Sequence, residues 1–135
     1  MGARYLLDTN TVSYVIKGNL PVVRERLQEC APSEIAISVI TEGELRFGVL
    51  RLPVAKRLAL VVEEFLRFVE IHPWNSAAAR HYAQLRASIE QEGRPMGNLD
   101  LMIASHSLAL GTVLVSSDRV FRRVKDLKIE DWARP

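Results

Sequence analysis

Short apolar runs alternate with segments of helical periodicity along the whole chain, and this alternation limits most strongly the folds open to it. The runs predicted to be strands are residues 3–7, 35–39, 69–71, 112–115 and 127–130. Strands that alternate with helices form a parallel sheet, because a helix carries the chain back to the start of the next strand. The sequence therefore predicts an α/β fold in which a parallel, five-stranded sheet lies between two layers of helices.

Capping residues and helix breakers set the expected helix boundaries. Asn10 is the expected N-cap of a helix that runs to Lys17 and stops at Gly18, and Pro21 suits the first position of the next helix. Further helices are predicted at 42–51, from Pro53 onward, at 75–92 and at 99–110, with a helical turn at 119–124. After Pro53, one apolar stripe is expected at helical spacing, formed by Val54, Leu58, Val61, Val62, Phe65 and Leu66.

The composition fits one globular domain that covers residues 1–135. Apolar residues make up 48% of the chain and charged residues 25%, and no apolar run approaches the ~20 residues that a membrane-spanning helix needs. Arg4 precedes only a short strand, with Asp8 close behind, so we expect no signal peptide. The single cysteine, Cys30, suits a reducing compartment, and we expect a cytoplasmic protein without a membrane segment.

Four carboxylates occur where an apolar run gives way to a turn or to the start of a helix: Asp8, Glu44, Asp100 and Asp118. Because ligands of open α/β sheets bind outside the carboxyl ends of the strands, we expect these acids to converge at one edge. Each acid also has a purely structural explanation, as a turn former, as a charge that favours a helix N-terminus, or as part of a Thr41–Glu44 capping box. The predicted convergence of all four acids on one edge of one sheet favours a functional site.

Four converging carboxylates predict a cation site. Two like charges ~8 Å apart repel by about 2 kcal/mol at an effective dielectric constant of about 20, so such a cluster attracts cations. Oxygen ligands suit Mg²⁺ or Mn²⁺, and such an ion makes a bound water reactive towards phosphorus. The acids therefore predict hydrolysis of a phosphodiester.

Other chemistries receive little support from the sequence. His72, His81 and His106 lack the spacing and cysteine partners of a zinc site, and His106 is expected to be packed or to act as a cap. No nucleophile elbow, P-loop or dinucleotide-binding glycine motif is present. The net charge of +2 is too small for a dedicated nucleic-acid surface. A basic cluster near the end of the chain gives weak support for a phosphate-bearing substrate: Arg119, Arg122, Arg123, Lys125 and Lys128.

The chain resembles the PIN-domain ribonucleases, and within them the VapC toxins of prokaryotic toxin–antitoxin pairs. The resemblance lies in four segments that follow one another with family-like spacing, and in the closing residues 129–132. The segments are Tyr5-Leu6-Leu7-Asp8-Thr9-Asn10, Ser38-Val39-Ile40-Thr41-Glu42-Gly43-Glu44-Leu45, Gly97-Asn98-Leu99-Asp100-Leu101-Met102-Ile103-Ala104 and Val115-Ser116-Ser117-Asp118-Arg119-Val120-Phe121. Any one of them is a loose pattern, but the ordered set is specific.

This resemblance implies a PIN-like three-layer fold and a role for each candidate residue. Catalysis and binding of Mg²⁺ or Mn²⁺ are assigned to the four acids Asp8, Glu44, Asp100 and Asp118. Glu44 is preferred to Glu42 because the glutamate of the family directly precedes a leucine, here Leu45. Asn10 and Ser116 match polar positions that line the pocket and orient the acids or bound waters.

The resemblance also implies partners. The expected activity is metal-dependent cleavage of RNA, often in a tRNA or ribosomal RNA loop, by a homodimer that a VapB-like antitoxin inhibits. The apolar surface of residues 42–68 gives modest independent support, since it exceeds what one sheet face needs and suits an amphipathic helix. Core packing explains any single one of these residues equally well.

Three other classes of protein are alternatives to a metal-dependent ribonuclease. A receiver domain would need paired acids after the first strand, whereas Asp8 stands alone and the third strand ends at His72 and Pro73. A non-catalytic PIN-like interaction module would be indicated by a missing acid, and all four are present. A structure-specific DNA nuclease uses the same metal chemistry, but 135 residues leave little room to grip a duplex.

Overall fold

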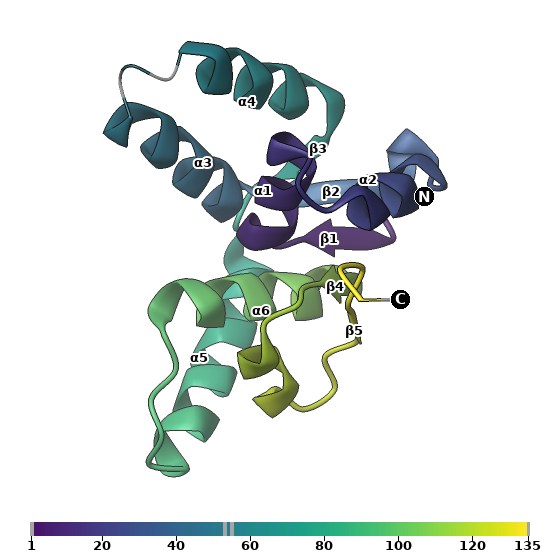
Figure 1. Ribbon diagram of the computed structural model, residues 1–135. Coiled ribbons are helices and arrows are strands. Elements are labelled where there is room, and N and C mark those ends of the chain that lie inside the picture. The colour runs from purple at the N-terminus through teal and green to yellow at the C-terminus, as the bar shows by residue number, and fades with distance from the viewer. Residues whose placement is uncertain (1, 53, 55, 135) are drawn as a thin grey trace.

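Five parallel strands form a sheet in the order β3-β2-β1-β4-β5 in the computed structural model, which describes residues 2–52, 54 and 56–134 (Figure 1). The strands are β1 (Tyr5–Leu7), β2 (Ile35–Ser38), β3 (Glu70–His72), β4 (Val113–Val115) and β5 (Ile129–Glu130). The helices are α1 (Thr9–Lys17), α2 (Pro21–Gln28), α3 (Val39–Arg51), α4 (Lys56–Phe68), α5 (Ser76–Gln91) and α6 (Asn98–Leu110), with 3₁₀ turns η1 (Pro32–Glu34) and η2 (Arg119–Arg123). The predicted parallel five-stranded sheet is confirmed.

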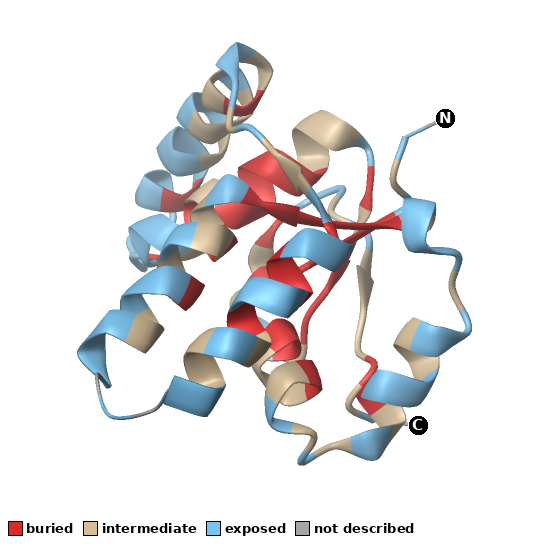
Figure 2. Ribbon diagram, turned by 90° about the horizontal axis from the view of Figure 1, so that it is seen from above, coloured by how far each residue is buried: buried red, intermediate tan, exposed pale blue. Residues whose placement is uncertain are grey.

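Both faces of the sheet are covered, as the apolar character of its strands predicts. Successive side chains of a strand point to opposite faces, so Tyr5 and Leu7 join one core cluster and Leu6 the other. Helices α1 to α4 cover the first face, and α5, α6 and η2 cover the second (Figure 1). The most buried positions accordingly follow the sheet and the inner sides of these helices (Figure 2).

The cap of helix α1 differs from the prediction. Asp8, not Asn10, is the N-cap, and its side chain accepts a hydrogen bond from the backbone of Thr11. Either residue type caps well, so the position of the strand end decides: β1 stops at Leu7 and the helix begins at Thr9. The predicted stop at Gly18 is confirmed, since its left-handed φ of 66° ends the helix.

Helix α3 begins at Val39, three residues before the predicted start at 42. Ser38 ends β2 and caps α3 at once, because its hydroxyl accepts a hydrogen bond from the backbone N–H of Ile40 at 3.0 Å. The alternative of a Thr41–Glu44 capping box is therefore wrong, and Glu44 lies in the second turn of the helix.

The predicted helix start at Pro53 lies outside the described residues, and α4 is described from Lys56. Within the predicted stripe, Val62, Phe65 and Leu66 are buried. Val54 does not belong to the stripe, since it precedes the helix and is 91% exposed.

An aromatic pair and a buried polar contact between two helices complete the core. Trp132 is buried and packs edge-on against Tyr5, with ring centroids 5.2 Å apart. His106 is buried in α6, as predicted for a packed histidine, and its Nδ1 lies 2.8 Å from the hydroxyl of Ser38. This contact ties the start of α3 to the middle of α6. Along residues 2–52, 54 and 56–134, no helix combines the length and apolar character needed to cross a bilayer.

Candidate active site

The four predicted acids lie around one small cavity at the carboxyl edge of the sheet. Asp8 directly follows β1, Glu44 lies on α3, Asp100 on α6, and Asp118 follows β4. Together with Asn10 they line a cavity of about 100 Å³, whose walls are completed by Thr9, Leu99, Ile103 and Phe121. The convergence expected from the sequence is thus present in the structure.

Asp8 is the most enclosed of the four acids. Its carboxylate accepts a 2.8 Å hydrogen bond from the backbone N–H of Thr11, and the hydroxyl of Ser116 also donates to it. Burial raises the pKa of Asp8 above its ordinary value, although these hydrogen bonds act against the rise, and the charge of Asp118 adds to it. The fold therefore holds the Asp8 carboxylate in place, and burial makes its ionised form less favourable.

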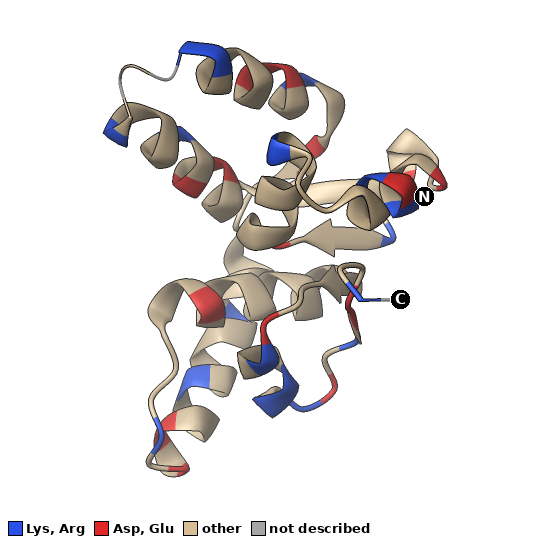
Figure 3. Cartoon of the chain, in the orientation of Figure 1, with Lys and Arg blue, Asp and Glu red and all other residues tan. Residues whose placement is uncertain are grey.

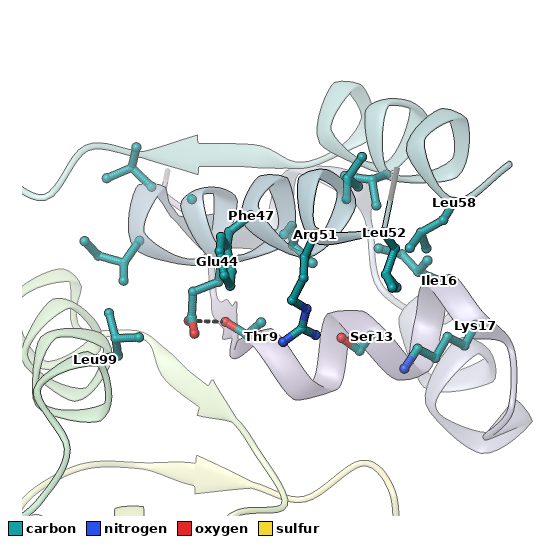
Figure 4. A pocket seen from close by; sticks show the side chains of 17 residues that line it. Thr9, Ser13, Ile16, Lys17, Glu44, Phe47, Arg51, Leu52, Leu58 and Leu99 are labelled. Carbon is teal, nitrogen blue, oxygen red and sulfur yellow. Dashed lines mark hydrogen bonds between the residues drawn. The ribbon is translucent and has the colours of Figure 1, made fainter. Parts of the chain in front are cut away.

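Glu44 is oriented by a residue that the sequence analysis did not single out. The hydroxyl of Thr9 lies 2.6 Å from Oε1 of Glu44 and donates a hydrogen bond to it (Figure 4). The buried Thr41 hydroxyl lies 3.4 Å from the same Thr9 oxygen. One oxygen of Glu44 is thus fixed from the side of α1, and Thr9 and Glu44 together form part of the cavity wall.

Asp100 and Asp118 lie at the N-terminal ends of α6 and η2, where free backbone N–H groups favour a negative charge. Asp100 lies in the first turn of α6, next to the positive end of the helix dipole. Burial raises the pKa of Asp100, and repulsion from Asp118, Glu44 and Asp8 raises it further. Asp118 is exposed and caps η2 by accepting a 2.9 Å hydrogen bond from the N–H of Val120. Three other acids therefore act on the charge of Asp100.

The two polar residues predicted for the pocket take different places. Asn10 is exposed and lines the cavity. Ser116 is 2% exposed and lies behind the wall, where it donates to Asp8 and accepts a 3.0 Å hydrogen bond from the N–H of Asp118. Ser116 therefore connects two acids and does not line the cavity.

Thr9 and Thr11 are the polar residues of the site that the sequence analysis missed. Thr11 supplies its N–H to Asp8, and its hydroxyl donates to the carbonyl of Val115 at 3.0 Å. A signal for Thr11 was present, since a residue three positions after an aspartate is the expected partner of an N-cap. For Thr9 the signal was weaker, because its partner Glu44 lies 35 residues away.

The donor set around the cavity suits a hard cation. All four acids offer carboxylate oxygens, the ligands that Mg²⁺ and Mn²⁺ accept. In the part of the chain that is described, no group of three or more His, Cys, Asp or Glu side chains is close enough together to hold a metal ion. A positive charge in the cavity would relieve the repulsion that Asp118, Glu44 and Asp8 exert on Asp100.

A second, larger cavity adjoins the first between α1, α3 and α4. It has a volume of about 720 Å³, and we call it the apolar groove because aliphatic and aromatic side chains form most of its walls (Figure 4). Thr9, Glu44 and Leu99 line both cavities. The apolar groove therefore opens at one end onto the acidic cavity.

Fold and cavity together define an α/β protein with a carboxylate site at the carboxyl edge of its sheet. The sequence matches the PIN domain over residues 5–127. A tRNA(fMet)-specific endonuclease VapC from Salmonella typhimurium is 37% identical over 130 residues, 96% of this chain and 98% of that protein. A protein of the same name from Shigella flexneri is 35% identical over 131 residues, again 96% and 98% of the two chains.

The solved structures give the same result. The VapBC complex from Salmonella typhimurium, crystallised bound to DNA, contains a chain that superimposes with a TM-score of 0.90 at 37% identity, over 96% of this chain and 98% of that one. The protein therefore belongs to the PIN-domain family and, within it, to the VapC group.

Proposed function

We propose that this chain is a metal-dependent endoribonuclease toxin, held inactive by a cognate VapB-like antitoxin. The observation that carries the proposal is the cavity of about 100 Å³ lined by Asp8, Glu44, Asp100 and Asp118. The names of the relatives support this proposal. Proteins that are 30–37% identical to this chain over nearly their full length are named as VapC endonucleases or ribonucleases.

The four carboxylates are the proposed ligands of Mg²⁺ or Mn²⁺. When bound, such a cation neutralises charge on the scissile phosphate and makes a bound water acidic enough to act as a nucleophile. The chain supplies the positioning: the Thr11 amide and the Ser116 hydroxyl hold Asp8, and the Thr9 hydroxyl holds Glu44. Asn10 lines the same cavity and offers its side-chain amide to a substrate or to a water.

RNA is the proposed substrate, in a short exposed loop of a tRNA or ribosomal RNA. Figure 3 shows Lys and Arg positions on the short helical turn that follows β4. Exposed basic residues follow Asp118 along η2 and the segment after it: Arg119, Arg122, Lys125 and Lys128. None of these four forms an ion pair with a described residue, so they are available to phosphate oxygens. The tRNA(fMet) of the relatives is the first substrate to test.

The antitoxin is proposed to occupy the apolar groove. Phe47 and Leu52 in its walls are 62% and 48% exposed, which is unusual for large apolar side chains in a cavity. A segment in this groove would reach Thr9, Glu44 and Leu99 and so close the acidic cavity. The neighbours of known structure include VapBC complexes from three organisms, which supports a VapB-like partner. A cytoplasmic location and a homodimer remain part of the proposal.

The test is cleavage of total RNA and of tRNA(fMet) by purified, antitoxin-free protein. A discrete fragment is expected with Mg²⁺ or Mn²⁺ and no fragment with EDTA. Asp8→Asn should abolish the fragment and Asp126→Asn should not, because Asp126 is exposed in a left-handed turn outside the cavity, with φ 68°. Growth arrest on expression that disappears in Asp8→Asn would link the cleavage to toxicity.

The same assay separates the alternatives. Cleavage of a DNA oligonucleotide in place of RNA would indicate a structure-specific DNA nuclease. A folded protein that cuts neither substrate with either metal would indicate a non-catalytic interaction module. Undiminished cleavage by Asp8→Asn would mean that the assigned site is wrong.

A further inference from the structure

Two cations project into the apolar groove. Lys17 from the end of α1 and Arg51 from the end of α3 both line it, and Figure 4 shows Arg51 reaching from α3 towards α1 while Lys17 extends along α1 beside Ser13. Neither forms an ion pair with a carboxylate among the residues described. The guanidinium of Arg51 lies 5.7 Å from the ring centre of Phe47, which is itself 62% exposed.

The charges in the groove follow a fixed order. Glu44 and Arg51 are seven residues apart on α3, which is about 10.5 Å along a helix axis. Thr9 and Lys17 are eight residues apart on α1, about 12 Å. The backbone positions that bear the two cations are therefore roughly 10–12 Å further along their helices than Glu44 and Thr9. Figure 4 shows the Arg51 side chain leaning over α1 between Thr9 and Ser13, with Lys17 beyond Ser13.

Local structure accounts for part of this arrangement. Lys17 and Arg51 each lie in the last turn of their helix, where a positive charge interacts favourably with the negative end of the helix dipole. That explanation applies to each residue by itself and does not require both side chains to point into the same groove. Arg67 fulfils the same condition at the end of α4 but lines neither the groove nor the acidic cavity, and so serves as a matched control.

We propose that Lys17 and Arg51 form an anion clasp that selects a carboxylate in the antitoxin segment bound to the apolar groove. This inference rests on the proposed function, since it takes an antitoxin segment as the occupant. That segment would place an Asp or Glu side chain between Arg51 and Lys17, further along the groove than the part that reaches Glu44, and apolar residues beside it.

A protein segment fits the groove better than an RNA backbone does. Phosphate oxygens are recognised on polar surfaces, whereas the cations here project from walls formed by Ile16, Leu45, Val49 and Leu58. An amphipathic protein segment can cover these apolar walls with its apolar side chains and at the same time place a carboxylate beside the two cations. The basic residues after Asp118 lie outside the groove and remain available to RNA.

The test is a selection from a random twelve-residue peptide library displayed on phage, with immobilised protein as bait. Wild type and Arg67→Glu are expected to enrich apolar peptides that carry Asp or Glu at a fixed offset from the apolar positions. The double variant Lys17→Glu/Arg51→Glu should enrich Lys or Arg at that offset. Lys17→Gln/Arg51→Gln should show no charge preference, and this neutral pair guards against a charge reversal that prevents folding. A synthetic peptide selected by wild type should bind the Gln pair at least about tenfold more weakly.

The outcomes separate this proposal from the proposed function. Identical, acid-free peptides from wild type and both double variants would refute the clasp, as would failure to enrich any peptide. Loss of RNA cleavage in both double variants, with unchanged peptide selection, would mean that the cations hold RNA and would also refute it. A wild-type protein that selects acidic peptides but does not cleave RNA would support the clasp and contradict the nuclease.

Discussion

Asp8 is expected to serve two separable purposes, and two substitutions at this position separate them. Its carboxylate caps α1 through a 2.8 Å hydrogen bond from the buried N–H of Thr11, and it faces the acidic cavity. Asparagine retains an acceptor oxygen for the cap but loses the charge, whereas alanine loses both. Asp8→Asn and Asp8→Ala should therefore be equally inactive and unequally stable.

The expected difference in stability follows from the cap. Loss of an N-cap acceptor, with a buried N–H left without a partner, costs about 1–2 kcal/mol. Both variants remove the buried charge of Asp8, whose pKa is raised by burial, so that contribution cancels in the comparison. With an unfolding entropy of about 2.1 cal/mol/K per residue, 135 residues give ~0.28 kcal/mol/K, and the alanine variant should melt about 3.5–7 °C below the asparagine variant.

The measurement is thermal unfolding followed by circular dichroism, with RNA cleavage assayed on the same preparations. Glu25→Gln and Glu25→Ala provide the matched control, because this exposed residue lies within α2 and lines neither cavity, and its side chain forms no ion pair with a described residue. Equal melting temperatures for Asp8→Asn and Asp8→Ala would refute the capping argument. Cleavage by Asp8→Asn at the parental rate would refute the assignment of the site.

Two further predictions concern the electrostatics and the positioning of the acids. Burial, and then repulsion from Asp118, Glu44 and Asp8, raise the pKa of Asp100, so the folded state binds its proton more tightly than the unfolded state and stability falls as pH rises above about 4. Asp100→Asn should thus be more stable than the parent at about pH 7, with a smaller gap at about pH 4 in urea titrations, and a constant gap would contradict this reasoning. Thr9→Val should weaken Mn²⁺ binding by about 10–100-fold in calorimetry because Glu44 loses its donor, whereas Thr9→Ser should retain it. Equal Mn²⁺ affinities for both variants would show that Thr9 does not position Glu44.

The sheet and the gathering of the acids were predictable from local patterns. Strands β1 and β2 are short apolar runs with every residue buried, and Asp8 and Asp118 follow β1 and β4. Glu44 lies on the helix that follows β2, and Asp100 lies in the first turn of the helix that leads back into β4, so the topology brings the acids to one edge. The start of α3 was not predictable in this way. Val39 and Ile40 continue the apolar pattern of β2, and only the capping hydroxyl of Ser38 shows that the strand has already ended.

Contacts between side chains from distant segments could also not be predicted from the sequence. The hydrogen bond from Thr9 to Glu44 joins residues 35 apart, and the contact between Ser38 and His106 joins residues 68 apart. Such pairs depend on the relative placement of two helices, which periodicity does not encode. They nevertheless fix the carboxylate of Glu44 and the mutual position of α3 and α6, which bear two of the four acids.

The shared wall of the two cavities implies that metal binding and antitoxin binding are coupled. Thr9, Glu44 and Leu99 line both the acidic cavity and the apolar groove, so a segment that fills the groove end approaches the oxygens proposed to hold the cation. Competition at Glu44 should weaken antitoxin binding in the presence of Mn²⁺, and by linkage the antitoxin must weaken Mn²⁺ binding by the same factor, typically about 5–150-fold. Calorimetric titration of each ligand, with and without the other, measures both factors. If the two ligands bind independently, the antitoxin segment does not reach Glu44. It would then inhibit by excluding RNA from the surface beside the cavity, without blocking the metal site.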